Sequence, residues 1–381
     1  MASTIYKADN GVWHYDDGIK KYTQEEADEI NRKEMEKEKS FIPQILDDGF
    51  IDFPVFFEHP NGELEESSFY IPPTFEPSNM EGFYEKHKMH YNIYIPSYGR
   101  AGNAPTVDML ERHGITSYYI AVDPSQYPEY KKHYPIDRII VRDPSFRGTE
   151  KLDLVTSIVS PNSMHGTAGV YNSLLYFSKS LGETHYWTMD DDFIGMAMKA
   201  RKGNESAKAG EKYDKDNYYR CSHILDEYGF SMHKFLADIE ELTMKMRNPG
   251  FVGLEKFGLV FTLPVMWKNG TRVYSFYLSR NDTQVDHLGQ HNNDVVTSLE
   301  LSKHGMVNML FEGISYNSKA TQLSGGLTEV YQKFGTLDKG KVLVRAQPNY
   351  SKINVNYNRI HHTVDYTKYN KQRLVGAPKK E

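Results

Sequence analysis

The chain has 381 residues, of which 39% are hydrophobic and 25% are charged, so it is long enough for one large or two moderate globular domains. A net charge of −6 argues against a generally basic nucleic-acid binder and leaves room for local basic patches only. The single cysteine, Cys221, excludes an internal disulfide framework and fits a reducing compartment. No apolar run approaches the roughly 18 residues of a membrane helix, and the first residues form no apolar signal core. We therefore expect no membrane association and a cytoplasmic location.

Residues 1–88 are interpreted as a small N-terminal α+β extension of unknown role. The motif Thr23-Gln24-Glu25-Glu26 predicts the start of a charged surface helix that runs to about residue 39, with Thr23 as N-cap and Glu26 closing a capping box. Prolines between residues 69 and 83 favour an extended linker. We place the boundary of the main domain at residues 87–90.

From residue 91 the chain alternates between strand and helix patterns. We expect strands at 91–95, 117–122, 138–141 and 185–189, with helices at 106–113, 126–133 and 164–181. Repeated β-α-β units predict a parallel sheet with right-handed crossovers. The predicted fold class is therefore α/β, a Rossmann-like and mostly parallel central sheet flanked by helices, in a domain that covers residues 89–370.

The second half of this domain is less regular. Residues 199–220 are polar, with an excess of Lys and Arg, and predict a mobile basic loop. Further along we expect helices at 230–246, 295–304 and 327–334, an antiparallel pair of strands at 258–265 and 271–278, and a strand at 307–311. Residues 371–381 predict a flexible basic tail.

The chain is organised around the strand at 185–189, which ends abruptly in Asp190-Asp191-Asp192. In open α/β sheets, ligands bind at the carboxyl ends of the strands. Three neighbouring carboxylates repel one another unless a cation lies among them, and hard oxygen ligands suit Mg²⁺ or Mn²⁺. Such an ion is the usual partner of a diphosphate. A solvated acidic turn is the alternative interpretation.

Two more strand ends carry candidate ligand-binding residues. The turn Pro96-Ser97-Tyr98-Gly99-Arg100 allows close backbone approach, and Arg100 suits a phosphate. It lacks the glycine spacing of the dinucleotide fingerprint, so an ordinary strand-to-helix turn stays open. At the end of the next strand, Asp123 suits a ribose or a base, and equally a helix cap.

Three later motifs complete the candidates. Asp294 precedes a helix and would either cap it or act as a base toward an acceptor hydroxyl. The glycines Gly325 and Gly326 would admit a sugar or phosphate close to backbone N–H groups, or form a plain turn. The pair His361-His362 beside Asp365 would supplement a carboxylate-bound metal ion, or lie on the surface.

Taken together, these motifs resemble those of GT-A-fold glycosyltransferases. More narrowly, the chain is similar to the TET/JBP-associated glycosyltransferases, which are found largely in phage and are predicted to decorate hypermodified DNA bases. The resemblance spans roughly residues 91–369 and is most specific at the strand that ends in the three aspartates. Asn172 matches an Arg-Asn pair of the family with Tyr171 in place of the arginine, and Asn293-Asp294 stands where Glu-Asp is expected.

The resemblance implies a metal-dependent transferase that takes a sugar from a nucleotide-sugar, expected to be UDP-linked. Asp190 and Asp192, with His361 or His362, would hold Mn²⁺ or Mg²⁺ at the donor diphosphate. Asp191 and Asp294 would be the catalytic residues, the first near the sugar or ribose and the second at the acceptor hydroxyl. The expected nucleotide-sugar-binding residues are Pro96, Ser97, Tyr98, Gly99, Arg100, Asp123, Asn172, Asp190, Gly325 and Gly326.

The expected acceptor is a hydroxymethylated pyrimidine base in double-stranded DNA, extruded from the helix to reach the site. The loop residues Arg201, Lys202, Lys208 and Lys212 would then hold DNA phosphates, and the protein would work in the host cytoplasm if a phage encodes it. Two alternatives remain. One is a glycosyltransferase with a protein or glycan acceptor, and the other is a nucleotidyltransferase or a non-catalytic nucleic-acid-binding module.

Overall fold

The structure of the protein is a computed structural model. It describes residues 4–7, 13–16, 23–38, 56–58, 64–66, 89–142, 166–197, 199–201, 218–220, 230–246, 248–259, 267–283, 285, 287, 291–319, 337–356 and 359–366. The predicted helix at 327–334, Gly325 and Gly326, and the tail 371–381 lie outside the described residues. Within the described residues no helix is long and apolar enough to cross a membrane.

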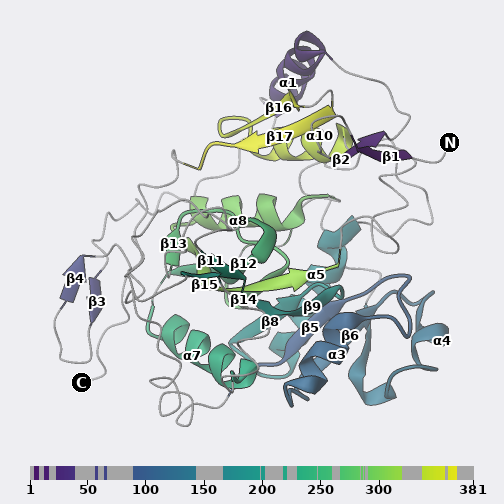
Figure 1. The fold of residues 1–381 in the computed structure, drawn as a ribbon. Coiled ribbons are helices and arrows are strands. Elements are labelled where there is room, and N and C mark those ends of the chain that lie inside the picture. The colour runs from purple at the N-terminus through teal and green to yellow at the C-terminus, as the bar shows by residue number, and fades with distance from the viewer. Residues whose placement is uncertain are drawn as a thin grey trace.

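A curled sheet of nine strands forms the centre of the described structure (Figure 1). Its parallel half consists of β7 (Ile139–Val141), β6 (Tyr118–Val122), β5 (Ile93–Pro96) and β8 (His185–Met189), in that spatial order. This half follows the predicted β-α-β units closely, and the predicted α/β, Rossmann-like fold class is confirmed.

The other half of the sheet is mixed in direction. Strand β14 (Phe276–Arg280) runs antiparallel to β8, and β12 (Pro249–Lys256) runs antiparallel to β14. Strand β15 (Val307–Ser318) returns parallel to β12, and both β13 (Trp267–Asn269) and β9 (Phe193–Ala197) pair antiparallel to β15. The parallel character is therefore concentrated in the first half of the domain.

Helices cover both faces of the sheet because the strands alternate two sets of buried side chains. Ile93 and Ile95 of β5 face α3 (Pro105–Arg112) and α7 (Met232–Met244), whereas Tyr94 between them packs near α5 (Gly166–Ser180). Helix α8 (Asn293–Lys303) packs on the same side as α5, so α7 and α8 lie on opposite faces (Figure 1).

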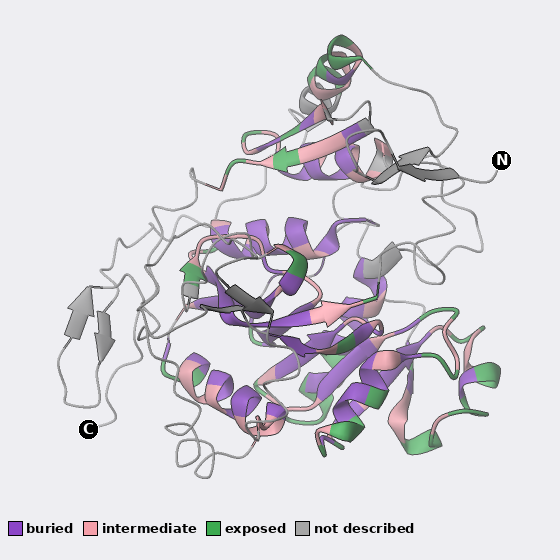
Figure 2. Ribbon diagram, viewed as in Figure 1, coloured by how far each residue is buried: buried purple, intermediate pink, exposed green. Residues whose placement is uncertain are grey.

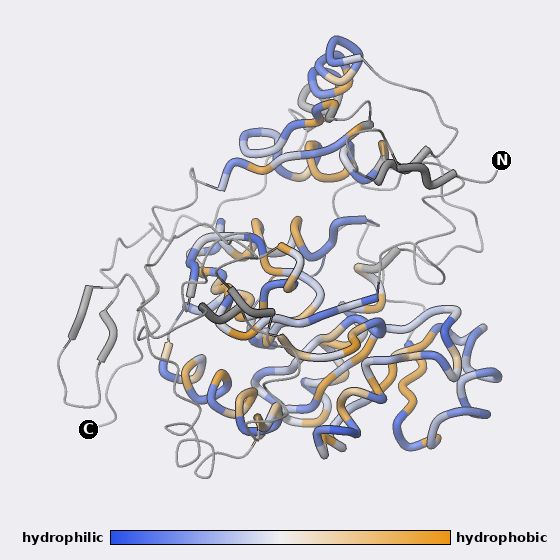
Figure 3. Tube along the Cα trace, viewed as in Figure 1, coloured by the Kyte–Doolittle hydropathy of each residue, from blue (hydrophilic) through white to orange (hydrophobic). Residues whose placement is uncertain are grey.

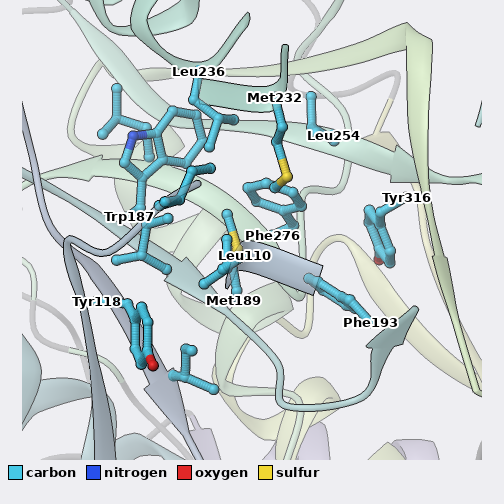
Figure 4. Close-up of a cluster of buried hydrophobic side chains, with 14 of the residues drawn as sticks. Leu110, Tyr118, Trp187, Met189, Phe193, Met232, Leu236, Leu254, Phe276 and Tyr316 are labelled. Atoms are coloured by element: carbon cyan, nitrogen blue, oxygen red, sulfur yellow. The ribbon is translucent and has the colours of Figure 1, made fainter. Parts of the chain in front are cut away.

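The largest apolar cluster lies under α3 and α7 and is shown in Figure 4. Trp187 and Met189 of β8 meet Leu110 of α3, while Met232 and Leu236 descend from α7. The sheet strands are buried, whereas α1 (Gln24–Glu38) and α4 (Tyr127–Tyr130) carry exposed residues on their outer sides (Figure 2). Hydropathy follows the same division, with apolar segments in the sheet and a mostly hydrophilic α1 (Figure 3).

A separate layer above α8 joins distant parts of the chain (Figure 1). It contains α10 (Leu337–Ala346), the antiparallel pair β16 (Ser351–Asn356) and β17 (Arg359–Val364), and α1. Asn31 of α1 both donates to and accepts from the backbone of Ile353, at 2.7 and 2.6 Å. The predicted capping box of α1 is confirmed, since the Glu26 N–H donates to Thr23 Oγ1 at 3.2 Å and the Thr23 N–H donates to Glu26 Oε2 at 2.9 Å.

The prediction of a strand at 258–265 was wrong at its start. Residues Phe257–Leu259 form a 3₁₀ turn, the strand lies earlier as β12, and residues 260–266 lie outside the described part of the chain. Gly253 explains the close contact of β12 with β14, because a Cβ there would collide with the carbonyl oxygen of Phe276. Strand β15 also extends past its predicted end, to Ser318.

Short elements complete the described residues. The strand pairs β1 (Thr4–Lys7) with β2 (Trp13–Asp16) and β3 (Phe56–Glu58) with β4 (Leu64–Glu66) lie in the N-terminal segment. Strands β10 (Lys199–Arg201) and β11 (Tyr218–Arg220) pair antiparallel, so the two ends of the predicted basic loop are held together. A 3₁₀ turn, Ile136–Arg138, precedes β7.

Candidate functional site

The three aspartates form a tight turn between β8 and β9, at the carboxyl end of the parallel strands. The turn is fixed by its backbone: the Asp190 N–H donates to the Ser275 carbonyl at 2.9 Å, and the Asp190 carbonyl accepts from Thr106 Oγ1 at 2.5 Å. The same Thr106 hydroxyl accepts from the Phe193 N–H at 2.9 Å. Because Thr106 lies in the first turn of α3, the helix and the acidic turn hold each other in place.

Asp191 points into the protein and organises the turn that follows β5. Its carboxylate pairs with the Arg100 guanidinium and accepts from Ser97 Oγ at 2.5 Å. Tyr130 links the same turn, since its hydroxyl lies 2.6 Å from Ser97 Oγ and accepts from the Arg100 N–H at 3.0 Å. Burial raises the pKa of Asp191, against the opposing charge of Arg100 and the bond from Ser97. Arg100, predicted to meet a phosphate, is therefore already engaged by a carboxylate.

Asp190 and Asp192 are only partly buried and are close enough to repel each other. Burial, followed by the negative charge of Asp192, raises the pKa of Asp190 to about 7. The Tyr171 hydroxyl donates to Asp190 Oδ1 at 3.2 Å. Burial also raises the pKa of Asp192, although the positive charge of Arg100, followed by that of Lys256, opposes the rise. A divalent cation would relieve this repulsion, and carboxylate oxygens are the ligands it prefers.

The carboxylate oxygens of Asp190 and Asp192 are the type of ligand that Mg²⁺ and Mn²⁺ prefer, but the described residues supply few such ligands. Among the described residues, no three His, Cys, Asp or Glu side chains are grouped so that they could hold a metal ion. Asp190, Asp192, His361 and His362 are all described, so they do not form one ligand set in this structure. A Mg²⁺ site of one or two carboxylates completed by substrate phosphates and waters is a common arrangement.

Asp294 lies in the first turn of α8, in a second polar cluster. Its Oδ1 accepts from the Val295 N–H at 2.8 Å, while the residue before the helix, Asn292, adopts a left-handed conformation with φ of 55° and makes no side-chain cap. Burial raises the pKa of Asp294, and the positive charge of Lys339 opposes that rise. The negative charge of Asp294 in turn contributes to the raised pKa of Asp190, so the two clusters face each other.

Four tyrosines lie near Asp294. Burial raises the pKa of each, and the negative charge of Asp294 adds to the rise for Tyr171, Tyr274, Tyr277 and Tyr366. The Tyr171 hydroxyl thus connects Asp190 with the surroundings of Asp294.

The histidine pair lies on β17, near Asp294. His362 Nε2 is 3.4 Å from Asn292 Nδ2, and burial followed by the charge of Lys339 lowers the pKa of His362 to about 4. His291 experiences the same two influences, and its pKa is likewise about 4. No role was predicted for His291 from the sequence, although it lies in the motif that contains Asp294, and Lys339 lies in no recognisable local pattern.

Two other predicted donor-binding residues are engaged inside the protein. Asp123 accepts from Arg142 at 3.0 and 2.8 Å and from the backbone and hydroxyl of Ser125 at 2.9 and 2.6 Å. Burial would raise the pKa of Asp123, but these bonds outweigh it and leave the pKa low. The Asn172 side chain forms a two-bond pair with the backbone of His287, at 2.9 and 2.6 Å.

The remaining predicted residues fall in three places. Pro96 ends β5, Tyr98 is 37% exposed beside it, and the Gly99 N–H donates to Gln126 Oε1 at 3.0 Å. Arg201 ends β10, opposite Tyr218. Outside the described residues are Lys202, Lys208, Lys212, Gly325 and Gly326.

The acidic turn lies at the carboxyl edge of a Rossmann-like sheet, where ligands bind in open α/β folds, and Asp294 lies in the first turn of α8. The family model of the TET-Associated Glycosyltransferases matches residues 91–326, more than half of the 381 residues. The chain belongs to that family and is a glycosyltransferase. No curated protein matches the sequence. The matched residues include both carboxylate clusters and end before α10, β16 and β17.

Proposed function

We propose that this glycosyltransferase moves a sugar from a UDP-sugar to a hydroxymethylated pyrimidine base in double-stranded DNA, with the help of Mn²⁺ or Mg²⁺. The observation that carries the proposal is the acidic turn, where Asp190 and Asp192 repel each other at the ligand-binding edge of the sheet. The family membership supports the transferase activity. The donor, the metal and the acceptor are parts of the proposal.

On the donor side, Asp190 and Asp192 would hold the divalent ion. Bound there, the ion supplies positive charge that stabilises the departing diphosphate. The turn that follows β5 is fixed by the bonds of Asp191 with Ser97 and Arg100, so these three side chains would act on the donor indirectly. These side chains therefore keep the carboxylates of the acidic turn in place while the donor is bound.

Basic residues near the acidic turn add positive charge for the diphosphate. Lys319 follows β15, where its N–H donates to the Asp192 carbonyl at 2.9 Å and its Nζ donates to Asn103 Oδ1 at 3.0 Å. Lys256 ends β12, and both lysine charges act on Asp192. Neither residue was among the sequence candidates.

On the acceptor side, Asp294 would accept the proton of the attacking hydroxyl. The raised pKa of this carboxylate, caused by burial, brings it toward the range of an effective general base at neutral pH. Tyr171 and Tyr274 lie near this carboxylate, since its charge adds to the rise in the pKa of both.

For the acceptor, a base in duplex DNA must leave the helix before its hydroxymethyl group reaches a recessed carboxylate. The paired strands β10 and β11 would present the loop between them to the DNA backbone. We call Arg201, Lys202, Lys208 and Lys212 the loop basic set. These four side chains would contribute phosphate contacts and hence a salt-dependent affinity.

The test incubates the protein with UDP-sugars, Mn²⁺ and either unmodified or hydroxymethylated DNA, followed by mass spectrometry of the digested nucleosides. A glycosylated nucleoside formed only from hydroxymethylated DNA supports the proposal. Release of UDP without labelled DNA would move the acceptor to a protein or a glycan. Intact DNA binding without any turnover of a donor would contradict the proposed reaction.

A further inference from the structure

Helices α8 and α10 lie side by side with their N-terminal ends together. At one end, Asn292 Nδ2 donates to the Lys339 carbonyl at 2.9 Å. At the other end, Gln347, just after α10, donates from its Nε2 to Glu300 of α8. Val295, Val296 and Leu299 of α8 pack against Val342, Leu343 and Ala346 of α10. The two helices are therefore fixed in direction and in register, with α10 outside the residues that the family model matches.

Lys339 lies in the first turn of α10 and Asp294 in the first turn of α8, so this packing places both residues at the same end of the helix pair. Burial lowers the pKa of Lys339 and the negative charge of Asp294 opposes that change, just as Lys339 opposes the rise at Asp294. The two helix N-termini add partial positive charge on the same side as Lys339.

Asn292 is suited to hold this arrangement. Its left-handed backbone conformation turns the chain into α8 and directs the side-chain amide to the start of α10. A displacement of α10 would consequently move Lys339 and Asn292 together. The position of Lys339 is set by backbone and amide contacts as well as by charge.

We propose that Lys339 is a positioning residue that orients Asp294 and compensates its charge, so that the C-terminal unit of α10, β16 and β17 completes the acceptor side of the active site. This inference rests on the proposed role of Asp294 as the acceptor base. In the reaction, the acceptor oxygen bonds to the anomeric carbon of the sugar, and the bond from that carbon to the diphosphate oxygen breaks. The hydroxyl proton passes to Asp294, the electron pair leaves with the diphosphate, and Lys339 keeps its proton.

The kinetic test compares Lys339→Met and Lys339→Arg with the wild-type protein, at saturating acceptor and varied UDP-sugar. General bases contribute about 10²–10⁴-fold, so we expect Lys339→Met to lose about 10–100-fold in kcat with the donor KM within twofold of wild type. Lys339→Arg keeps the charge and should recover most of kcat. Lys352→Met, at an exposed position on β16 of the same unit, is the matched control and should behave as wild type.

An unchanged kcat in Lys339→Met, or a change confined to the donor KM, overturns the proposal. The second result would make Lys339 a diphosphate ligand. An equal loss in the arginine and methionine variants also contradicts it, because charge would then not be what matters.

A second measurement does not depend on catalysis. The Tm values of Asp294→Asn, Lys339→Met and the double variant form a cycle, in which each single variant leaves one shielded charge without its partner. We expect the double variant to lose at least about 2 °C less than the sum of the single losses. Additive losses would refute the pairing. If the wild-type protein transfers no sugar to DNA while the cycle shows coupling, the proposed function fails and the pairing of Lys339 with Asp294 stands.

Discussion

Replacement of Arg100 by methionine tests whether this arginine holds the acidic turn or waits for a phosphate. The side chains of Arg100 and Asp191 are 18% and 7% exposed, so their ion pair is largely shielded from water. Removal of one partner from a buried ion pair costs about 3–5 kcal/mol, because the other charge is left without compensation. Here Ser97 still donates to Asp191 and Arg100 is partly solvated, so we expect a loss of about 2–3 kcal/mol.

The decisive comparison is a double-variant cycle with Asp191→Asn, measured by urea unfolding in EDTA at pH 7.5. Asp191→Asn removes the charge that Arg100 neutralises, so the double variant should lose at least about 1.5 kcal/mol less than the sum of the single losses. Arg112→Met is the matched control, since Arg112 lies on the exposed surface of α3 and, within the described part of the chain, its side chain donates only to the Ile194 carbonyl, at 3.1 Å. The control should change the stability by about 0.5 kcal/mol or less. Additivity of Arg100→Met and Asp191→Asn within about 0.5 kcal/mol would refute the structural role assigned to the pair.

Three further predictions address the metal, the DNA and the buried acid of α7. Asp192→Ala should abolish transfer with an unchanged circular dichroism spectrum, and excess chelator should silence the wild-type protein; full activity in chelator would contradict a metal-held donor. Reversal of the charges of the loop basic set should weaken DNA binding and flatten the salt dependence of the affinity by up to about 0.9 log units per lost phosphate contact, and an unchanged salt slope would reject this surface. Burial raises the pKa of Glu240 to about 7, whereas in the unfolded chain this carboxyl has its ordinary pKa of about 4.5. The folded protein therefore keeps the proton up to a higher pH than the unfolded chain does. The free energy of unfolding should fall by up to about 3 kcal/mol as the pH rises from about 4.5 to about 7. Glu240→Gln should flatten that fall in pH-dependent urea unfolding, whereas Glu241→Gln, at a surface pair with Lys245, should not, and equal slopes in wild type and Glu240→Gln would rule out this acid as the source.

The parallel half of the sheet was predictable because its strands are short apolar runs between clear stops. β5, β6 and β8 each end at a proline or an aspartate, and their helices begin or end at proline and glycine, so period and punctuation agree. Strand β12 escaped prediction because Pro249, Gly250 and Gly253 are typical of turns. In the folded protein Gly253 is required by the close approach of β14, a tertiary reason that no local pattern reveals.

The C-terminal unit was missed for similar reasons. Helix α10 contains Gly340 and the β-branched residues Val342 and Val344, which weaken its helical signal. Gly340 is close to Ile353 of β16, since a Cβ at this glycine would lie 3.0 Å from Cγ1 of Ile353. Strand β17 carries the two histidines amid polar residues, so its sequence suggested a ligand motif before it suggested a strand. The apolar spacing of Ile353 and Val355 on β16 was the available signal.

For the site, the sequence located carboxylates but not their partners. Asp190, Asp191 and Asp192 are a local motif at a strand end, and the structure brings Asp294 opposite them. The partners that give these residues different roles come from elsewhere: Arg100 holds Asp191 and Lys339 faces Asp294. Such pairings depend on how helices and strands pack, and a single sequence carries no direct record of them.

The contact between α1 and β16 affects the order in which the protein can fold during synthesis. Asn31 and Ile353 are 322 positions apart, so α1 is synthesised long before the strand that it binds. Until that strand arrives, the side of α1 that carries Ala27 has no partner among Val344, Ile353 and Ile360. The contact between α1 and β16 should form late in folding, because the chain between them must lose conformational entropy before the two elements meet. A chain that ended after the family-matched residues 91–326 would therefore carry the acidic turn and Asp294 but lack α10, which packs on α8.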